Sequence, residues 1–224
     1  MSSKHKKSTS EKKIIGVTGT YCAGKNHVGK ILEKRGLPVL DLDKLGHSVI
    51  ETEKDRLLER FGEDILGKDG LVDRKLLGEK VFGRPSELAA LEEIIHPAVN
   101  RETLAWIDSQ KKRSCVINAA LLHRSSALEL LDAVIVVKAP LHIRLLRAKK
   151  RDNLPWPALL KRFQSQKEIK SQYFAEKTDI YRVSNPSGGT KSGIFSLRGR
   201  FLNAALEIRI DEILSLEGIK PVKV

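Results

Sequence analysis

The sequence of 224 residues has few cysteines, few aromatic residues and no long apolar run. Because no stretch reaches about 18 consecutive apolar residues, we expect no membrane-spanning helix. The two cysteines, Cys22 and Cys115, lie in or beside apolar segments, which favours free thiols in a reducing cytoplasm over a disulfide framework. Residues 1–13 are rich in Lys and Ser without an apolar segment, unlike a secretory signal. The expected location is therefore the cytoplasm.

Acidic residues are outnumbered by basic ones, 28 against 41, and the formal net charge is +13. Such an excess favours an anionic partner, and nucleic acid, a membrane surface and phosphorylated small molecules all qualify. Because the chain has no long apolar run, we expect no membrane partner. Aromatic residues make up only 5%, and no basic stretch is interleaved with them, so nucleic acid is not specifically indicated. A solvated basic surface is the simpler alternative. Part of the excess lies in residues 1–13, which we expect to form a basic disordered tail.

A glycine-containing loop is the strongest motif. It lies between an apolar strand pattern over residues 14–18 and a helix pattern with Val28, Ile31 and Leu32 on one face. Residues 19–25 read GTYCAGK, the Gly-x4-Gly-Lys spacing of a phosphate-binding loop. Backbone N–H groups, the helix N-terminus and the final lysine of this loop would face phosphate oxygens. A glycine turn that binds nothing is the alternative, and the flanking strand and helix favour phosphate binding.

Two positions in this segment have uncommon residues. The pattern expects Ser or Thr after the lysine as a magnesium ligand, and this chain has Asn26. An amide oxygen also binds Mg²⁺, directly or through water, so Asn26 is the candidate metal residue. Cys22 lies near a helix N-terminus and Lys25, and both favour its thiolate. Cys22 could be a redox-sensitive thiol or a small neutral loop residue, and we favour the neutral loop residue.

A second strand pattern over residues 37–43 ends in two acidic residues, Asp41 and Asp43. Alternate residues of an extended chain share a face, so we expect both carboxylates to point the same way. In open α/β sheets, ligands bind beyond the C-terminal ends of the strands, where this acid pair and the glycine loop are both expected. Asp43 is therefore a candidate catalytic base. It also precedes a helical stretch, so a helix N-cap is the alternative, and the two roles are compatible.

Strand and helix patterns alternate along the rest of the chain. Residues 114–118 and 132–138 are apolar strand candidates, and residues 178–184 are a further strand near a sheet edge. This alternation predicts an α/β fold with a doubly wound parallel sheet of about five strands. A terminal helix is predicted over residues 197–216. Its expected apolar face consists of Phe201, Leu202, Ala205, Ile208 and Ile213.

Residues 51–112 have a helical and connective pattern. We expect a turn at residues 67–70, a helix that starts within residues 71–76, and another over residues 87–95. The last of these should stop near His96-Pro97, because proline disfavours helical geometry in the residue before it.

A basic helical segment follows the strand at residues 132–138. Residues 141–150 are predicted to form a helix, residues 153–157 to break it, and residues 158–170 to resume it. Arg147 and Arg151 are four residues apart and share a face. A basic helix, a break and a second helix suit a lid that closes on anionic phosphates, and exposed helix charge is the alternative.

Taken in order, these motifs resemble the dephospho-coenzyme A kinase family over about residues 14–185. Any one motif is weak, whereas their order and spacing are specific. The matching residues are Gly16-Val17-Thr18-Gly19 with the phosphate loop, Val39-Leu40-Asp41-Leu42-Asp43, Phe61-Gly62, Gly70-Leu71-Val72-Asp73-Arg74 with Leu77, Val81-Phe82, His96-Pro97, Leu121-Leu122, Arg147 with Arg151, and Gln166.

The resemblance implies ATP- and Mg²⁺-dependent phosphorylation of the ribose 3′-hydroxyl of dephospho-coenzyme A, the last step of coenzyme A synthesis. The proton-accepting acid of the family falls on Asp43, with Lys25 as the second catalytic residue. Its substrate-binding motifs fall on Asp73, Arg74 and His96, together with Asp43. The residues expected to contact ATP are Gly19, Cys22, Ala23, Gly24, Lys25, Asn26, His27, Arg147 and Arg151.

The resemblance also implies a single P-loop kinase domain over residues 14–224. Its core is expected to comprise residues 14–50, 113–140 and 178–216. The helical substrate region is expected over residues 51–112 and the lid over residues 141–177.

Two departures from the family pattern leave alternatives open. Asn26-His27 stands where the family has Ser-Thr, and residues 120–124 read ALLHR where the family has Pro-Leu-Leu-x-Glu, so Arg124 replaces an acid. The alternatives are another nucleoside or nucleotide kinase, and a catalytically weak nucleotide-binding regulatory protein. The presence of Lys25 and Asp43 and of both lid arginines favours the dephospho-coenzyme A kinase. The sequence does not indicate an oligomeric state.

Overall fold

The computed structural model describes residues 12–122, 125–164, 178–186 and 197–220. This part of the chain forms two compact units. One is Asp41–Ser109, and the other consists of the described residues before and after that segment. None of the helices in these ranges combines the length and the apolar character that crossing a membrane requires.

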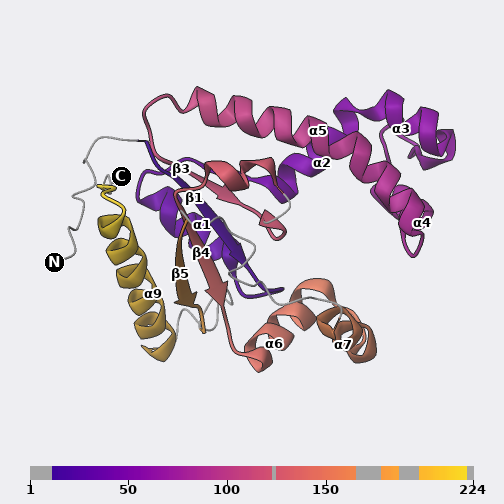
Figure 1. The fold of residues 1–224 in the computed structure, drawn as a ribbon. Helices are drawn as coiled ribbons and strands as arrows, with labels where there is room; N and C mark the ends of the chain where they lie inside the picture. Colours follow the sequence, from indigo (N-terminus) through magenta and orange to yellow (C-terminus); the bar gives the residue numbers. More distant parts are fainter. Residues whose placement is uncertain (1–11, 123–124, 165–177, 187–196, 221–224) are drawn as a thin grey trace. The chain divides into compact units, whose positions relative to one another are not determined.

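The larger unit is built on a five-stranded sheet with the order β2-β3-β1-β4-β5 (Figure 1). β1 pairs in parallel with β3 and β4, and β4 pairs in parallel with β5. The predicted doubly wound parallel sheet is confirmed, and the strand expected last is the edge strand β5. The strands are β1 Ile14–Gly19, β2 Val39–Asp41, β3 Cys115–Asn118, β4 Ala133–Lys138 and β5 Asp179–Ser184.

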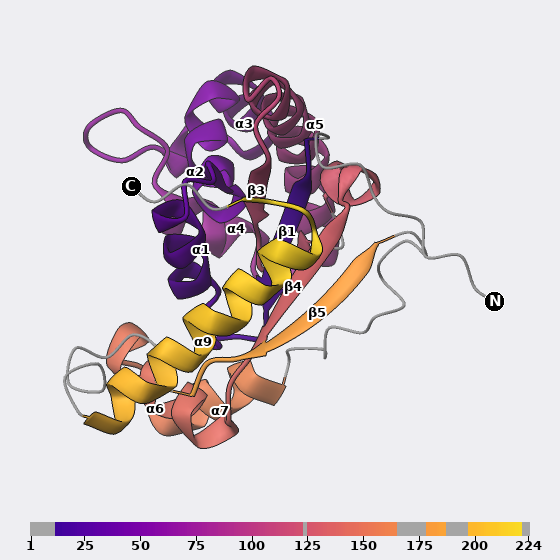
Figure 2. The same ribbon diagram turned by 90° about the vertical axis from the view of Figure 1, so that its left-hand side faces the viewer.

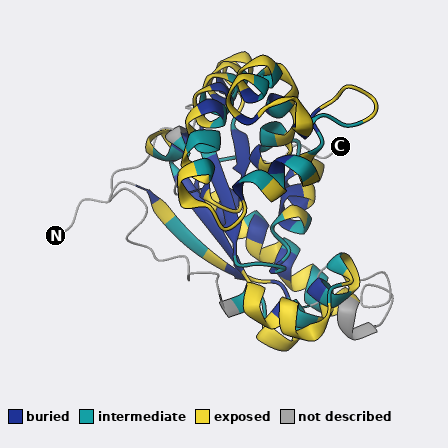
Figure 3. Cartoon of the chain, turned by 90° about the vertical axis from the view of Figure 1, so that its right-hand side faces the viewer, coloured by how far each residue is buried: buried dark blue, intermediate teal, exposed yellow. Residues whose placement is uncertain are grey.

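The central strands are apolar because both faces of the sheet are covered. β4, with the sequence AVIVVK, is buried at every position except its last, and the central strands are dark blue in Figure 3. On one face, a Cβ at Gly16 would lie 2.5 Å from Leu122 Cδ2 and 2.8 Å from Leu131 Cδ1. The glycine therefore lets these two leucines pack directly against the backbone of β1.

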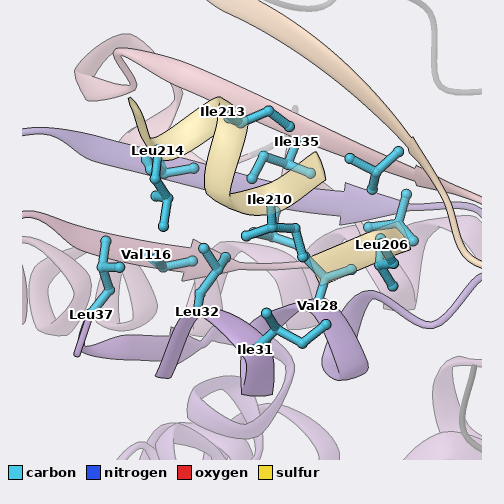
Figure 4. Close-up of a cluster of buried hydrophobic side chains, with 14 of the residues drawn as sticks. Val28, Ile31, Leu32, Leu37, Val116, Ile135, Leu206, Ile210, Ile213 and Leu214 are labelled. Atoms are coloured by element: carbon cyan, nitrogen blue, oxygen red, sulfur yellow. The ribbon is translucent and has the colours of Figure 1, made fainter. Parts of the chain in front are cut away.

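Two helices cover the other face of the sheet, α1 Lys25–Lys34 and α9 Leu197–Leu216 (Figures 1 and 2). Their side chains form one apolar cluster with β1, β3 and β4 (Figure 4). The helix α1 contributes the predicted face, with Val28, Ile31 and Leu32 all buried. The C-terminal helix thus packs against the helix that follows the glycine loop.

The predicted apolar face of α9 is wrong in part. Phe201 is 75% exposed and Ile208 is 60% exposed, whereas Ile213 is buried as expected. Apolar residues occur on more than one face of this helix, so helical spacing alone does not identify the face that packs. The side chains that α9 buries in the cluster are Leu206, Ile210, Ile213 and Leu214.

A helix pair follows β4 and lies near the end of the sheet where β1 and β4 terminate (Figure 1). The first is α6 Leu141–Asp152, and it ends at Asn153 in the left-handed conformation, with φ of 49°. The second, α7 Trp156–Gln164, begins two residues before the predicted start at residue 158. Pro157 is compatible with this earlier start because the first turn of a helix does not need the N–H that proline lacks. The remainder of the predicted helix, residues 165–170, lies outside the described residues.

The smaller unit is helical. A buried cluster that includes Leu57, Phe61, Ile65 and Leu77 forms its core, and the expected turn at residues 67–70 is closed by a bond from Gly70 N to Gly67 O of 3.0 Å. Its helices are α2 Leu42–Thr52, α3 Lys54–Phe61, α4 Arg74–Val81 and α5 Pro85–Ser109, with a 3₁₀ turn, η1, at Glu63–Ile65.

The predicted helix end at His96-Pro97 is wrong, because α5 continues through Pro97 to Ser109. Proline removes one backbone donor and disfavours the helix at the preceding residue, at a cost of about 3 kcal/mol. The adjoining turns bury Ile94 and Ala98, and Ile107 is buried further along the helix, so burial offsets the cost. Packing therefore overrides the local preference.

Candidate active site

The loop Gly19–Lys25 joins β1 to α1 at the point where the strand order reverses. Neighbouring strands β3 and β4 lie on either side of β1, and ligands of open α/β sheets bind outside such switch points. Within the loop, Ala23 N donates to Thr20 O at 2.9 Å. Gly24 is the N-cap of α1, and its carbonyl accepts from His27 N at 3.0 Å. The first N–H groups of a helix have no intrahelical acceptor, so this helix start offers donors to an anion.

Both loop glycines are required by the backbone. A Cβ at Gly19 would lie 2.7 Å from Val137 O. Gly24 has φ of 97°, and a Cβ there would lie 2.2 Å from Asn185 Nδ2. Cys22 also has a left-handed backbone, with φ of 58°, although it is not glycine. The loop therefore follows a tight path that other residue types rarely adopt.

Arginines of α6 and an asparagine after β5 hold the loop by its carbonyl groups. Arg144 Nε donates to Tyr21 O at 2.8 Å, and one Arg147 nitrogen donates to Cys22 O and Ala23 O, both at 3.1 Å. The other Arg147 nitrogen donates to Asn185 O at 2.7 Å, while Asn185 Nδ2 donates to Ala23 O at 3.1 Å. Burial lowers the pKa of both guanidinium groups, which nevertheless stay charged at neutral pH. With its carbonyls held in this way, the loop is fixed from the side of α6.

The ring of Tyr21 organises a second group of charges. Arg151 lies 4.9 Å from its ring centroid and Arg162 lies 5.8 Å from it. The Tyr21 hydroxyl donates to Asp152, which also accepts from Arg162 at 3.0 Å and from Arg151 at 2.7 Å. Phe163 meets the same ring edge to face at 5.1 Å. A loop side chain thus contacts two guanidinium groups, one from α6 and one from α7.

The expectation of a thiolate at Cys22 is wrong in direction. Burial raises the pKa of this thiol, although the positive charges of Arg151, Arg144, Arg147 and Arg162 oppose the shift. The sequence suggested that the helix N-terminus and Lys25 favour the thiolate, whereas desolvation of the half-buried sulfur has the larger effect. Cys22 is therefore a neutral loop residue at physiological pH, as the favoured alternative held.

An asparagine on the neighbouring strand joins the start of α1. Asn118 ends β3 and is only 3% exposed, and its Nδ2 donates to Asn26 Oδ1 at 3.0 Å. The same Asn26 oxygen accepts from Lys25 Nζ at 3.0 Å. Asn118 Oδ1 has no hydrogen-bond partner among the described residues. Sequence reasoning missed Asn118, although a polar residue that ends an apolar strand beside the loop was the available signal.

These amide oxygens decide whether the site suits a magnesium ion. Mg²⁺ bound with a nucleotide keeps several waters and takes few protein ligands, all oxygens. Asn26 Oδ1, next to Lys25, is a neutral oxygen that fits this use, whereas Asn118 turns its amide nitrogen toward it. No cluster of three or more His, Cys, Asp or Glu side chains arranged to hold a metal occurs in the described ranges.

The side chain of His27 faces α9. Its Nε2 lies 2.6 Å from Asn203 Oδ1, and Asn203 donates in turn to Glu207 at 2.7 Å. Its imidazole thus connects α1 to α9, while its backbone N–H donates to Gly24 O within the first turn.

The expected strand geometry of Asp41 and Asp43 is wrong. The strand β2 ends at Asp41, which is the N-cap of α2 and accepts from Asp43 N at 3.1 Å and from Lys44 N at 3.3 Å. Asp43 is an exposed residue in the first turn of α2. The two carboxylates therefore do not share a strand face, and the cap that was considered for Asp43 is provided by Asp41.

The remaining predicted substrate residues lie in the helical unit. Asp73 caps α4 and accepts from Lys75 N at 2.7 Å. Arg74 begins α4 and lines an open hollow of about 440 Å³ together with Lys75, Gly78, Glu79 and Phe82. His96 is exposed within α5, one residue before the internal proline. Two further positions of the family pattern, Gln166 and Arg124, lie outside the described residues.

The sheet order, the glycine loop and its lysine define the class of P-loop kinases. Solved structures share this fold: the crystal structure of TT1252 from Thermus thermophilus is 29% identical, with a TM-score of 0.68 and coverage of 91% of this chain and 98% of that chain. A shikimate kinase from Bacteroides thetaiotaomicron shares the fold at 13% identity, with a TM-score of 0.50. The match covers 91% of this chain and 98% of that chain.

Within this class, residues 13–181 match the dephospho-CoA kinase family. The dephospho-CoA kinase of Treponema pallidum is 34% identical over 182 residues, which cover 77% of this chain and 86% of that protein. The dephospho-CoA kinase of Anaeromyxobacter dehalogenans is 38% identical over 148 residues, which cover 63% of this chain and 70% of that protein. The chain belongs to the dephospho-CoA kinase family, and the resemblance stated from the sequence is confirmed.

Proposed function

We propose that the protein transfers the γ-phosphoryl group of ATP to the ribose 3′-hydroxyl of dephospho-coenzyme A. The observation that carries this proposal is the braced Gly19–Lys25 loop at the switch point of the sheet. Membership of the dephospho-CoA kinase family supports the choice of acceptor.

Phosphoryl transfer depends chiefly on positioning and on stabilising charge at the transferring oxygens. The N–H groups of the loop and of the first turn of α1 bind the β-phosphate, and Lys25 reaches the γ-phosphate oxygens. The bonds from Arg144, Arg147 and Asn185 to the loop carbonyls keep this cradle in shape before ATP arrives. Their role is to position the loop, whereas the guanidinium groups of Arg151 and Arg162 beside Tyr21 supply charge for the phosphates.

Asp43 is the proposed catalytic base, which accepts the proton of the acceptor hydroxyl. Its place in the first turn of α2, with an exposed side chain, suits a carboxylate that meets a substrate. Asn26 is the residue that would hold Mg²⁺, directly or through a water, and the bound ion would supply positive charge at the phosphates.

The helical unit is the proposed binding region for the rest of the acceptor. Arg74 and Lys75 place positive charge beside Phe82, which is 89% exposed, around one open hollow. A phosphorylated substrate with an aromatic base matches this combination of charge and ring. The proposal includes Asp73 and His96 as neighbours of that substrate.

A coupled assay of ADP release tests the acceptor. Dephospho-coenzyme A is compared with nucleosides and nucleoside monophosphates under identical ATP and Mg²⁺ concentrations. We expect turnover with dephospho-coenzyme A alone. Preferred turnover of a nucleoside or its monophosphate would instead identify a nucleotide kinase, and ATP binding without any turnover would identify a regulatory protein.

The Asp43→Asn variant tests the base. Loss of the proton acceptor should lower kcat by about 10²–10⁴-fold while the KM for ATP changes little, because general base catalysis contributes rate rather than nucleotide affinity. The control is Glu63→Gln, which removes a carboxylate from the 3₁₀ turn η1 of the same unit, away from the proposed base. Near-native turnover of Asp43→Asn would exclude Asp43 as the base.

A further inference from the structure

The side chain of Tyr21 connects the Gly19–Lys25 loop to both helices of the α6–α7 pair. The centroid of its half-buried ring lies 4.9 Å from the guanidinium of Arg151 in α6 and 5.8 Å from that of Arg162 in α7. Phe163 of α7 meets the same ring edge to face, with centroids 5.1 Å apart. Tyr21 occupies a variable position of the Gly-x4-Gly-Lys spacing, so phosphate binding by the loop backbone does not itself require an aromatic residue there.

The hydroxyl group of Tyr21 completes a closed set of polar contacts. It donates to Asp152, the last residue of α6, and Arg162 Nη1 donates to the same carboxylate at 3.0 Å. The same Arg162 nitrogen also donates to the Tyr21 hydroxyl oxygen at 3.2 Å. The Asp152 side chain is 15% exposed, against 50% for Arg162 and 59% for Arg151, so the carboxylate is the shielded member of the group. Hydrogen bonds to a shielded charge are stronger than those between neutral groups in water.

The two helices contact the loop in different ways. Arg144 and Arg147 of α6 donate directly to loop carbonyls. Arg162 and Phe163 of α7 contact the loop at the Tyr21 side chain. Removing that side chain should therefore loosen α7 from the loop, whereas the bonds from α6 to the loop backbone are kept.

We propose that Tyr21 is a positioning residue that docks α7 on the Gly19–Lys25 loop and holds the guanidinium groups of Arg151 and Arg162 beside it. This role rests on the proposed function, because these charges matter to the reaction only if the loop binds a triphosphate. An arginine side chain loses much rotamer freedom when it is fixed. Tyr21 and Asp152 restrict both arginines before the nucleotide binds, so the charge that phosphoryl transfer requires is already in place.

Tyr21→Phe and Tyr21→Leu separate the hydroxyl from the ring. In the ADP-release assay with dephospho-coenzyme A, loss of the hydroxyl should lower kcat by about tenfold, and loss of the ring as well should lower it by about 100-fold. The dissociation constant of ADP, measured by calorimetry, should stay within about threefold of wild type in both variants, because backbone N–H groups bind that nucleotide. The control is Phe201→Leu, which removes a ring that is 75% exposed on α9 and should leave kcat within about twofold of wild type.

Hydrogen exchange of α7 measures the docking without catalysis. In Tyr21→Leu, the amides of residues 158–164 should exchange about tenfold faster than in wild type, because local opening of α7 no longer breaks contacts with the loop. The amides of α1 should exchange within about twofold of wild type. A residue that merely stabilised the fold would change the exchange of both helices.

Asp152→Ala tests whether the hydroxyl acts through the carboxylate. In this background, Tyr21→Phe should change kcat by less than about twofold, because the acceptor of the hydroxyl is already absent. An undiminished tenfold loss would show that the hydroxyl acts without Asp152 and would overturn the assigned contact.

Native kcat and native exchange of α7 in Tyr21→Leu would overturn the positioning role and leave the proposed function intact. Equal losses of kcat and of ADP affinity would also overturn it, because Tyr21 would then support the loop rather than α7. A wild-type protein that releases no ADP with dephospho-coenzyme A would instead overturn the proposed function, and the positioning role with it. Tyr21→Phe keeps the ring, so it provides the result if Tyr21→Leu does not fold, as judged by circular dichroism.

Discussion

Single residues decide the geometry of the loop. Gly24 combines a left-handed backbone with close approach to the Asn185 side chain, and Gly19 lies directly against the Val137 carbonyl. Asn185 and Arg147 then bind loop carbonyls from outside. The anion-binding groups are thereby fixed before a ligand is present, which lowers the entropic cost of binding it.

Gly24→Ala should weaken ATP binding by about tenfold or more and destabilise the protein by about 1–3 kcal/mol. A side chain at this position is strained and would lie 2.2 Å from Asn185 Nδ2, so the loop must shift. Gly70→Ala is the matched control, because Gly70 also has positive φ, 74°, but no atom within 4 Å of its Cβ position. Calorimetric titration with ATP checks the effect, and equal ATP affinities in the two variants would contradict it.

The raised pKa of Cys22 predicts slow modification at neutral pH. The thiolate is the form that burial disfavours, so the native protein holds the thiol proton to higher pH than the unfolded chain does. The buried thiol of Cys22 therefore contributes to the free energy of unfolding below the ordinary thiol pKa. This contribution is lost as the pH rises through the folded-state pKa. Alkylation by iodoacetamide, followed by mass spectrometry of the Cys22 peptide, should be slower in native than in unfolded protein. Equal rates at pH 7.5 would show an unburied thiol.

The placement of individual residues was predictable where the motif is local and continuous. The loop glycines and Lys25 follow from spacing alone. Asn118 does not, because its proximity to Asn26 arises from strand order, which brings residues far apart in the chain into contact. Asp41 and Asp43 were misplaced because a helix began one residue after Asp41, and a cap and a strand end look alike in sequence.

Secondary structure elements follow local preference until packing outweighs it. The apolar strands and α1 were predicted because their pattern and their burial agree. In α9, several apolar faces competed, and contact with α1 and the sheet selected one of them. In α5, proline predicted a helix end that burial of Ile94 and Ala98 overrides.

Pro97→Ala should therefore raise the free energy of unfolding by about 1–3 kcal/mol, because alanine restores the missing backbone donor and removes the steric conflict. Pro85→Ala provides the comparison, because Pro85 is the first residue of α5, where proline is tolerated. Its free energy of unfolding should change by no more than about 0.5 kcal/mol. Chemical denaturation measures both. A destabilised Pro97→Ala protein would mean that the proline shapes the helix that the core requires.

The helix α9 completes the core of the sheet-bearing unit. The family match ends at residue 181, yet α9 lies beyond it and buries Ile210 against the cluster that includes α1. Arg35, just after α1, adds ion pairs to α9 with Asp211 at 2.7 Å and Glu207 at 3.3 Å. These contacts connect the N-terminal loop segment to a helix far along the sequence.

Ile210→Ala should lower the free energy of unfolding by about 2–5 kcal/mol, since it leaves a cavity between α9 and α1. Ile208→Ala, on the same helix but at a side chain that is 60% exposed, should change it by about 0.5 kcal/mol or less. Denaturant midpoints of the two variants provide the comparison. Similar losses for both residues would contradict the assigned packing face of α9.

The partnership of α1 with α9 also sets an order of events during translation. The glycine loop and α1 leave the ribosome early, whereas α9 is synthesised only after the strands and the helices α6 and α7. Until then, the apolar side of α1 lacks its cover and is a site where a chaperone can bind a nascent chain. We therefore expect the packing that supports the glycine loop to be completed late in biosynthesis.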